Sequence, residues 1–170
     1  MIIRLATNDD LNSLMSIFDH ARKFMQENGN PNQWINGYPS SQLILNEIKN
    51  HHCYVCQNEN GEILGTFCFI PGEDPTYAHI ENGSWLNNDP YYVVHRLATS
   101  GKQKGIADIC FKWCFEQCDN IRVDTHQDNR VMQHVLEKQG FTRCGIIYTD
   151  NGTPRISYQK TISKVDHSGC

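Results

Sequence analysis

One stretch of the sequence, residues 92–113, constrains the fold more than any other. It begins with a run rich in apolar and β-branched residues and ends in an apolar helical pattern. Between them lies a polar turn with two lysines at residues 100–104, called the basic turn below. Strand, turn and helix in this order form an anion site, because the free N–H groups and the dipole at a helix N-terminus attract phosphate oxygens. Gly105 lets the backbone approach a ligand closely, and the small Ala107 keeps side-chain bulk away from it. The stretch therefore predicts a docking site for a diphosphate-bearing cofactor.

The composition restricts the class of protein. The chain has 170 residues, 39% of them hydrophobic and 20% charged, as expected for a soluble globular domain with a sizeable core. A formal net charge of −4 argues against nucleic-acid binding and against a polybasic membrane patch. No apolar run approaches the ~20 residues that span a bilayer, and the N-terminus leads into a strand pattern rather than a signal peptide. We expect a cytoplasmic protein with no nucleic-acid or membrane partner.

The eight cysteines are expected to be reduced, because nothing in the sequence marks the chain for export. Cys110, Cys114 and Cys118 recur every fourth residue, which is the spacing of a helix face turned to the core. Cys53 and Cys56 have the spacing of a CxxC pair but lie in a strand pattern, and no second pair has ligand spacing. We interpret them as small buried hydrophobic side chains with no metal. A thiol or metal protein is an alternative that rests only on the number of cysteines.

The periodicity along the chain predicts one α/β domain over residues 1–162. The expected order is βααβββαβαββ, with a mixed, mostly antiparallel sheet of six to seven strands and about four helices. Residues 77–81 are predicted to be a third strand of the central meander, and residues 91–99 to be the strand before the basic turn.

Two segments fall outside this regular pattern. Residues 28–41 are rich in Asn, Gly, Pro and Ser but also carry Trp34, Ile35 and Tyr38. Two interpretations of this loop stay open: Trp34 pins it to the core, or it forms one wall of a substrate pocket. Residues 163–170 are expected to form a flexible tail.

Two motifs, one after the other along the chain, resemble the two signature motifs of the Gcn5-related N-acetyltransferase (GNAT) family. Lys102-Gln-Lys-Gly105-Ile-Ala107 is similar to the family's cofactor motif, which has Arg or Gln, two residues, Gly, one residue, and Gly or Ala. Residues 124–129 and 136–141 resemble the second signature, a strand followed by an Asn-capped helix and Gly-Phe. A P-loop is a poor match, because it would need glycine at Arg96 and a hydroxyl at Gln103.

The resemblance implies a GNAT-like fold and acetyl transfer from acetyl-CoA to a primary amine by direct attack in a ternary complex. The acceptor would be a small-molecule or peptide amine, and relatives commonly form homodimers. In such proteins the pyrophosphate lies on the basic turn and the pantetheine pairs with the strand before it. The resemblance therefore implies these cofactor-binding residues: Leu97, Ala98, Thr99, Lys102, Gln103, Lys104, Gly105, Ile106, Ala107 and Asn129.

Direct attack requires a neutral amine, and therefore a base with a pKa near the working pH. Glu81, at the end of the predicted third strand, is the first candidate, and a solvated carboxylate is the alternative. His95 is placed on the same face as Val93 and Leu97 and is either a proton acceptor or a hydrogen-bonded core histidine. Tyr148 is a candidate acid, or a packed strand tyrosine.

In the GNAT family, the acid that protonates the departing CoA thiolate is often a tyrosine seven residues after the helix-capping Asn, which is Asn129 here. Here that position is Leu136, so a non-catalytic acyl-CoA-binding sensor of the same fold is an alternative function. Asp124 is predicted to hold the Asn-capped turn, His126 to be able to reach the cleft, and Asp74 to be solvated. Acidic residues in these loops favour a cationic amine as substrate.

Overall fold

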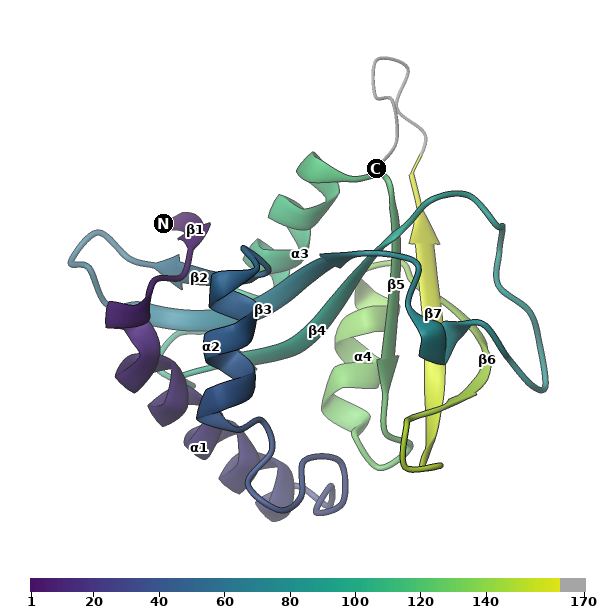
Figure 1. Ribbon diagram of the computed structural model, residues 1–170, viewed down its shortest axis with the longest axis horizontal. Coiled ribbons are helices and arrows are strands. Elements are labelled where there is room, and N and C mark those ends of the chain that lie inside the picture. Colours follow the sequence, from purple (N-terminus) through teal and green to yellow (C-terminus); the bar gives the residue numbers. More distant parts are fainter. Residues whose placement is uncertain (163–170) are drawn as a thin grey trace.

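A computed structural model describes residues 1–162 of the chain (Figure 1). The predicted tail at residues 163–170 lies outside the described residues. Seven strands form one sheet in the order β1-β2-β3-β4-β5-β7-β6, and every neighbouring pair is antiparallel except β4 and β5. The strands are β1 (Ile2–Leu5), β2 (Cys53–Gln57), β3 (Ile63–Pro71), β4 (Tyr92–Thr99), β5 (Asn120–Thr125), β6 (Thr142–Tyr148) and β7 (Pro154–Thr161). The helices are α1 (Leu11–Glu27), α2 (Ser41–Lys49), α3 (Ile106–Gln117) and α4 (Arg130–Lys138), with 3₁₀ turns η1 (Asn8–Asp10) and η2 (Pro75–Tyr77). The predicted fold class and element order are confirmed.

The sheet separates two layers of helices. Helices α1 and α2 cover one face, and α3 and α4 cover the other (Figure 1). Strand β2 shows how the sequence produces this division, because successive side chains of a strand point to opposite faces. Val55 packs in the core with α1 and α2, whereas the next residue, Cys56, packs in the core with α3.

The third strand predicted at residues 77–81 is wrong. Asp74 accepts a hydrogen bond from the backbone N of Thr76 at 2.9 Å, and Pro75 begins a 3₁₀ turn that ends at Tyr77. Proline at the first helical position favours such a turn, because its fixed φ already suits it. Of the remaining residues, Glu81 makes an isolated bridge to Ile146 of β6.

The cysteines at helical spacing are buried as predicted, with Cys110 at 1% exposure and Cys114 and Cys118 at 0%. The expectation of reduced thiols holds for six residues and fails for Cys118, which is disulfide-bonded. Within residues 1–162, no group of three or more His, Cys, Asp or Glu side chains could hold a metal ion. None of the helices in this range has the length and apolarity needed to cross a bilayer.

Candidate active site

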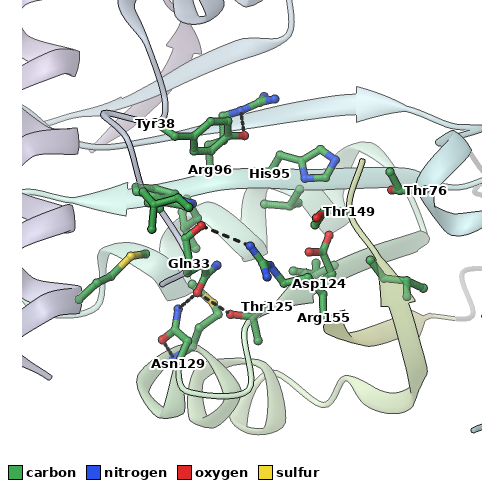
Figure 2. Close-up of a pocket in the computed structure, with 18 of the residues that line it drawn as sticks. Gln33, Tyr38, Thr76, His95, Arg96, Asp124, Thr125, Asn129, Thr149 and Arg155 are labelled. Atoms are coloured by element: carbon green, nitrogen blue, oxygen red, sulfur yellow. Dashed lines mark hydrogen bonds between the residues drawn. The ribbon is translucent and has the colours of Figure 1, made fainter. Parts of the chain in front are cut away.

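A cavity opens where β4 and β5 separate. The two strands pair only through Tyr92 with Ile121 and Val93 with Arg122, and beyond these pairs they diverge (Figure 1). A cavity of about 670 Å³ lies there, within the size range of small-molecule sites (Figure 2). Its lining comes from β4 (Val94, His95, Arg96, Leu97), β5 (Val123, Asp124, Thr125), the loop before α2 (Gln33 to Tyr38) and the β6–β7 turn with Arg155.

A bulge in β4 sets the direction of the side chains along this wall. The pairing register with β3 shifts opposite Arg96, whose φ of 55° lies in the left-handed region. The extra residue shifts the alternation of faces by one position. Leu97 therefore packs with Val94 against the core under α3, and the prediction that it shares a face with His95 is wrong.

Arg96 ties this bulge to the loop and to α2. Its Nε donates to the hydroxyl of Tyr38 at 2.8 Å (Figure 2). Its Nη1 donates to Glu47 Oε2 at 2.8 Å. The guanidinium and the Glu47 carboxylate are both about 15% exposed, so this ion pair is weakly screened by solvent. The wall of the cavity is thus held by charge pairing as well as by packing.

The loop at residues 28–41 combines both predicted roles. Trp34 is 9% exposed and packs edge-on against Phe18 of α1, which pins the loop to the core. The side chain of Gln33 reaches across the cavity, where its Oε1 accepts hydrogen bonds from Asn129 Nδ2 at 2.9 Å and Thr125 Oγ1 at 3.4 Å (Figure 2). Sequence reasoning missed Gln33, and the aromatic, irregular loop around it was the available signal.

His95 forms a carboxylate–histidine pair in the cavity. Its Nε2 lies 3.0 Å from Asp74 Oδ2, and the two side chains are 26% and 20% exposed. Burial alone would raise the pKa of Asp74, but hydrogen bonds from His95 and Thr76 outweigh it and lower the pKa to about 2. The prediction that Asp74 is solvated is therefore wrong, because the turn at Pro75 folds it inward.

Asp124 is a second carboxylate at the cavity. Its Oδ1 accepts a hydrogen bond from the Tyr77 hydroxyl at 2.5 Å. Burial, with the negative charge of Asp124, raises the pKa of Tyr77 far above its usual value, so the phenol remains a donor. The predicted turn-holding role of Asp124 is wrong. That role belongs to His126, whose Nδ1 accepts a hydrogen bond from the backbone N of Asp128 at 3.0 Å, and to Asn129, which caps α4.

The other two predicted catalytic residues meet each other outside this cavity. The Tyr148 hydroxyl donates to Glu81 Oε1 at 3.1 Å, and His79 lies 3.0 Å from Glu81 Oε2. The hydrogen bond from His79, followed by that from Tyr148, lowers the pKa of Glu81. Neither Glu81 nor Tyr148 is among the residues that line the cavity, so of the three predicted residues the structure places only His95 there.

The basic turn joins β4 to α3 and is exposed from Gly101 to Gly105. Gly105 has a φ of 82°, which favours glycine, and a Cβ placed there would meet nothing within 4 Å. The backbone N–H groups from Gln103 to Ala107 have no hydrogen-bond partner within the described chain. Lys102 forms an exposed ion pair with Glu62 at 2.8 Å. Free N–H groups and open space at the start of a 12-residue helix fit a diphosphate.

Comparison with known proteins identifies the fold. Residues 14–141 match the acetyltransferase (GNAT) family. A GNAT-family acetyltransferase from Streptococcus agalactiae is 30% identical, with a TM-score of 0.88 over 96% of both chains. The chain belongs to the GNAT acetyltransferase family. A search of curated proteins found no match.

More distant GNAT structures share the architecture. A GNAT-family acetyltransferase from Listeria monocytogenes is 19% identical, with a TM-score of 0.71 over 95% of this chain and 94% of the other. A ribosomal-protein-alanine N-acetyltransferase from Brucella melitensis is 17% identical, with a TM-score of 0.62 over 95% of this chain and 100% of the other. At these identities the likeness concerns the fold. GNAT membership supports acyl transfer and leaves the acceptor to be argued from the cavity.

Proposed function

We propose that this protein is an N-acetyltransferase that moves the acetyl group of acetyl-CoA to a primary amine by direct attack in a ternary complex. One observation carries the proposal: the opening between β4 and β5 contains the His95–Asp74 pair beside a second carboxylate, Asp124. An amine acceptor needs a group that takes its proton, and carboxylates attract it as a cation. The Brucella structure is named as an N-acetyltransferase, which agrees with this choice.

The residues that would hold acetyl-CoA follow the bulge at Arg96, along the end of β4 and the turn into α3. The free N–H groups from Gln103 to Ala107 would bind the pyrophosphate, and the backbone from Leu97 to Thr99 would pair with the pantetheine arm. Lys102 and Asn129 are the remaining predicted contacts; Lys102 is paired with Glu62, and Asn129 Nδ2 donates to Gln33 Oε1. Acetyl-CoA supplies a thioester, whose carbon–sulfur bond is exchanged for a carbon–nitrogen bond.

His95 is the base that the geometry favours. When Nε2–H is donated to Asp74, the other ring nitrogen, Nδ1, carries the lone pair that accepts a proton. Asp74 then fixes the tautomer and the ring orientation and stabilises the imidazolium that forms. Tyr77 holds the Asp124 carboxylate in place at the cavity wall. No acid from the protein is required, because a thiolate leaves readily near neutral pH.

Release of free CoA thiol with a panel of primary amines tests the proposal, and acetyl-CoA binding is measured separately by calorimetry. Turnover with at least one amine is the expected result. Binding without turnover across a broad panel would support the alternative, an acyl-CoA-binding sensor of the same fold.

The variant Gly105→Glu tests the donor site, which is the proposed pyrophosphate-binding site for acetyl-CoA at the start of α3. A carboxylate at the start of α3 would occupy the open space and repel the pyrophosphate, so acetyl-CoA affinity should fall at least about 100-fold. Gly29→Glu is the matched control, because Gly29 has a φ of 80° and is also open. It introduces the same charge and backbone strain away from α3. Wild-type affinity in a folded Gly105→Glu variant contradicts the assignment of the donor site.

A further inference from the structure

Two arginines line the cavity, and their surroundings differ. Arg96 donates to the Tyr38 hydroxyl and to the Glu47 carboxylate, so its charge is neutralised within the protein. Arg155, near the start of β7, is 9% exposed and belongs to the opposite side of the same cavity (Figure 2). Arg96 is thus paired with a carboxylate of the protein, and the partners of Arg155 are of a different kind.

Arg155 donates only to neutral groups within residues 1–162. Its Nη1 donates to the Pro154 carbonyl at 3.2 Å and its Nη2 to the Gln33 carbonyl at 3.3 Å. No carboxylate of the described chain forms an ion pair with it. A guanidinium has five N–H donors in a planar fork, so donors remain for a bound group that reaches it through the cavity.

A buried charge that forms no ion pair is costly, and a perturbed charged group that lines a cavity is a candidate binding residue. Burial lowers the pKa of Arg155, and the attraction of Asp124 opposes this effect without cancelling it. Asp124 is also engaged by the Tyr77 hydroxyl at 2.5 Å. The cavity therefore presents an incompletely neutralised cation on one side and the His95–Asp74 pair on the other.

We propose that the acceptor is a small zwitterion, a primary amine that also carries a carboxylate, with the carboxylate bound by Arg155 and the amine directed toward His95. This proposal rests on the proposed N-acetyltransferase function and adds the substrate class. The guanidinium fork matches the two oxygens of a carboxylate, and the Asp74 carboxylate beside His95 suits the ammonium form in which the amine arrives. An acceptor of this kind would satisfy both sides of the cavity at once.

The test compares acceptors in matched pairs that differ only in the carboxylate. The acceptors are the protein α-amino acids, β-alanine, γ-aminobutyrate and glycylglycine, each set beside its carboxamide. CoA thiol release gives kcat and KM for wild type, Arg155→Gln, Arg155→Lys and Arg143→Gln. Arg143 is an exposed residue of β6 and serves as the charge-matched control.

Wild type should favour at least one acid over its carboxamide by roughly 100-fold in kcat/KM, since a site built to pair a charge rejects a partner that lacks it. Arg155→Gln should bring this ratio close to one, mainly by raising KM for the acid, with the KM for acetyl-CoA unchanged. Arg155→Lys should recover part of the ratio, and Arg143→Gln should retain it. Turnover of the carboxamide by Arg155→Gln shows that the variant is folded.

The outcomes separate this proposal from the one on which it rests. If wild type acetylates only amines without a carboxylate, or if Arg155→Gln keeps the acid preference, the zwitterion proposal is overturned while N-acetyl transfer stands. If no amine is acetylated, N-acetyl transfer fails. Calorimetric titration of the same acids and carboxamides in the presence of CoA then decides whether the cavity binds a carboxylate through Arg155. Binding of an acid that depends on Arg155 supports the proposed carboxylate site, and its absence overturns it.

Discussion

Replacing Asp74 by asparagine should destabilise the protein in a way that depends on pH. The pKa of Asp74 is lowered from 3.8 to about 2. The difference of almost two pH units corresponds to about 2.5 kcal/mol at 1.36 kcal/mol per unit. The side chain is 20% exposed, so solvent screening removes only part of this, and we expect Asp74→Asn to lose about 2 kcal/mol of unfolding free energy at pH 6.

The sign follows from the direction of the shift. A carboxylate whose pKa is depressed by folding stabilises the protein above its unfolded pKa of 3.8, and this stabilisation is lost as pH falls through about 2. Urea unfolding of wild type and Asp74→Asn at pH 6, 4 and 3 should show that the difference in their unfolding free energies falls to about half by pH 3. Asp89→Asn, at an exposed aspartate of the β3–β4 loop, should leave stability unchanged. An equal difference in unfolding free energy between wild type and Asp74→Asn at pH 6 and at pH 3 would refute the role assigned to the His95–Asp74 pair.

Three further predictions concern the cavity and the core beneath it. His95→Gln should lower kcat about 100-fold with little change in acetyl-CoA affinity, whereas Glu81→Gln should stay within about twofold; equal losses in the two variants, measured by thiol release, would argue against His95 as the base. Gln33→Ala should speed hydrogen exchange in the loop at residues 28–41, because Thr125 and Asn129 lose their shared acceptor, and unchanged exchange would contradict that anchoring role. Leu136→Ala should cost about 2–5 kcal/mol in urea unfolding, because Leu136 is 0% exposed; a loss below about 1 kcal/mol would mean that the core closes over the space.

The fold could be predicted because its signals are local and repeated. Each helix within residues 1–162 carries apolar residues at helical spacing. The Asn129 side chain caps α4, and Gly140 follows that helix with a φ of 84°. The strand, turn and helix around Gly105 likewise lie within one short stretch, so their order in the chain is also their order in space.

The errors arose where tertiary contacts decide local structure. Residues 77–81 alternate like a strand, yet Tyr77, which is 2% exposed and donates a hydrogen bond to Asp124, ends a 3₁₀ turn instead. The bulge at Arg96 moved Leu97 to the other face, and no pattern of apolar residues marks a single inserted residue. Asp74 follows Gly72-Glu73 and precedes Pro75, a sequence typical of an exposed turn. Only the hydrogen bond to His95 shows that its side chain points inward.

The proposed binding sites for acetyl-CoA and for the acceptor differ in how far apart their residues lie along the chain, and this difference explains what the sequence could reveal. The proposed acetyl-CoA turn depends on backbone N–H groups of adjacent residues, so its parts lie together in one motif of six residues, Lys102 to Ala107. The proposed acceptor site joins Gln33 to Asn129 across 96 residues and Arg155 to Gln33 across 122 residues. Each contact depends on side-chain identity at a position fixed by a different element, so substrate choice can change by single substitutions while the donor motif stays intact. Arg155 is therefore the position at which a change of acceptor should leave acetyl-CoA binding unaltered.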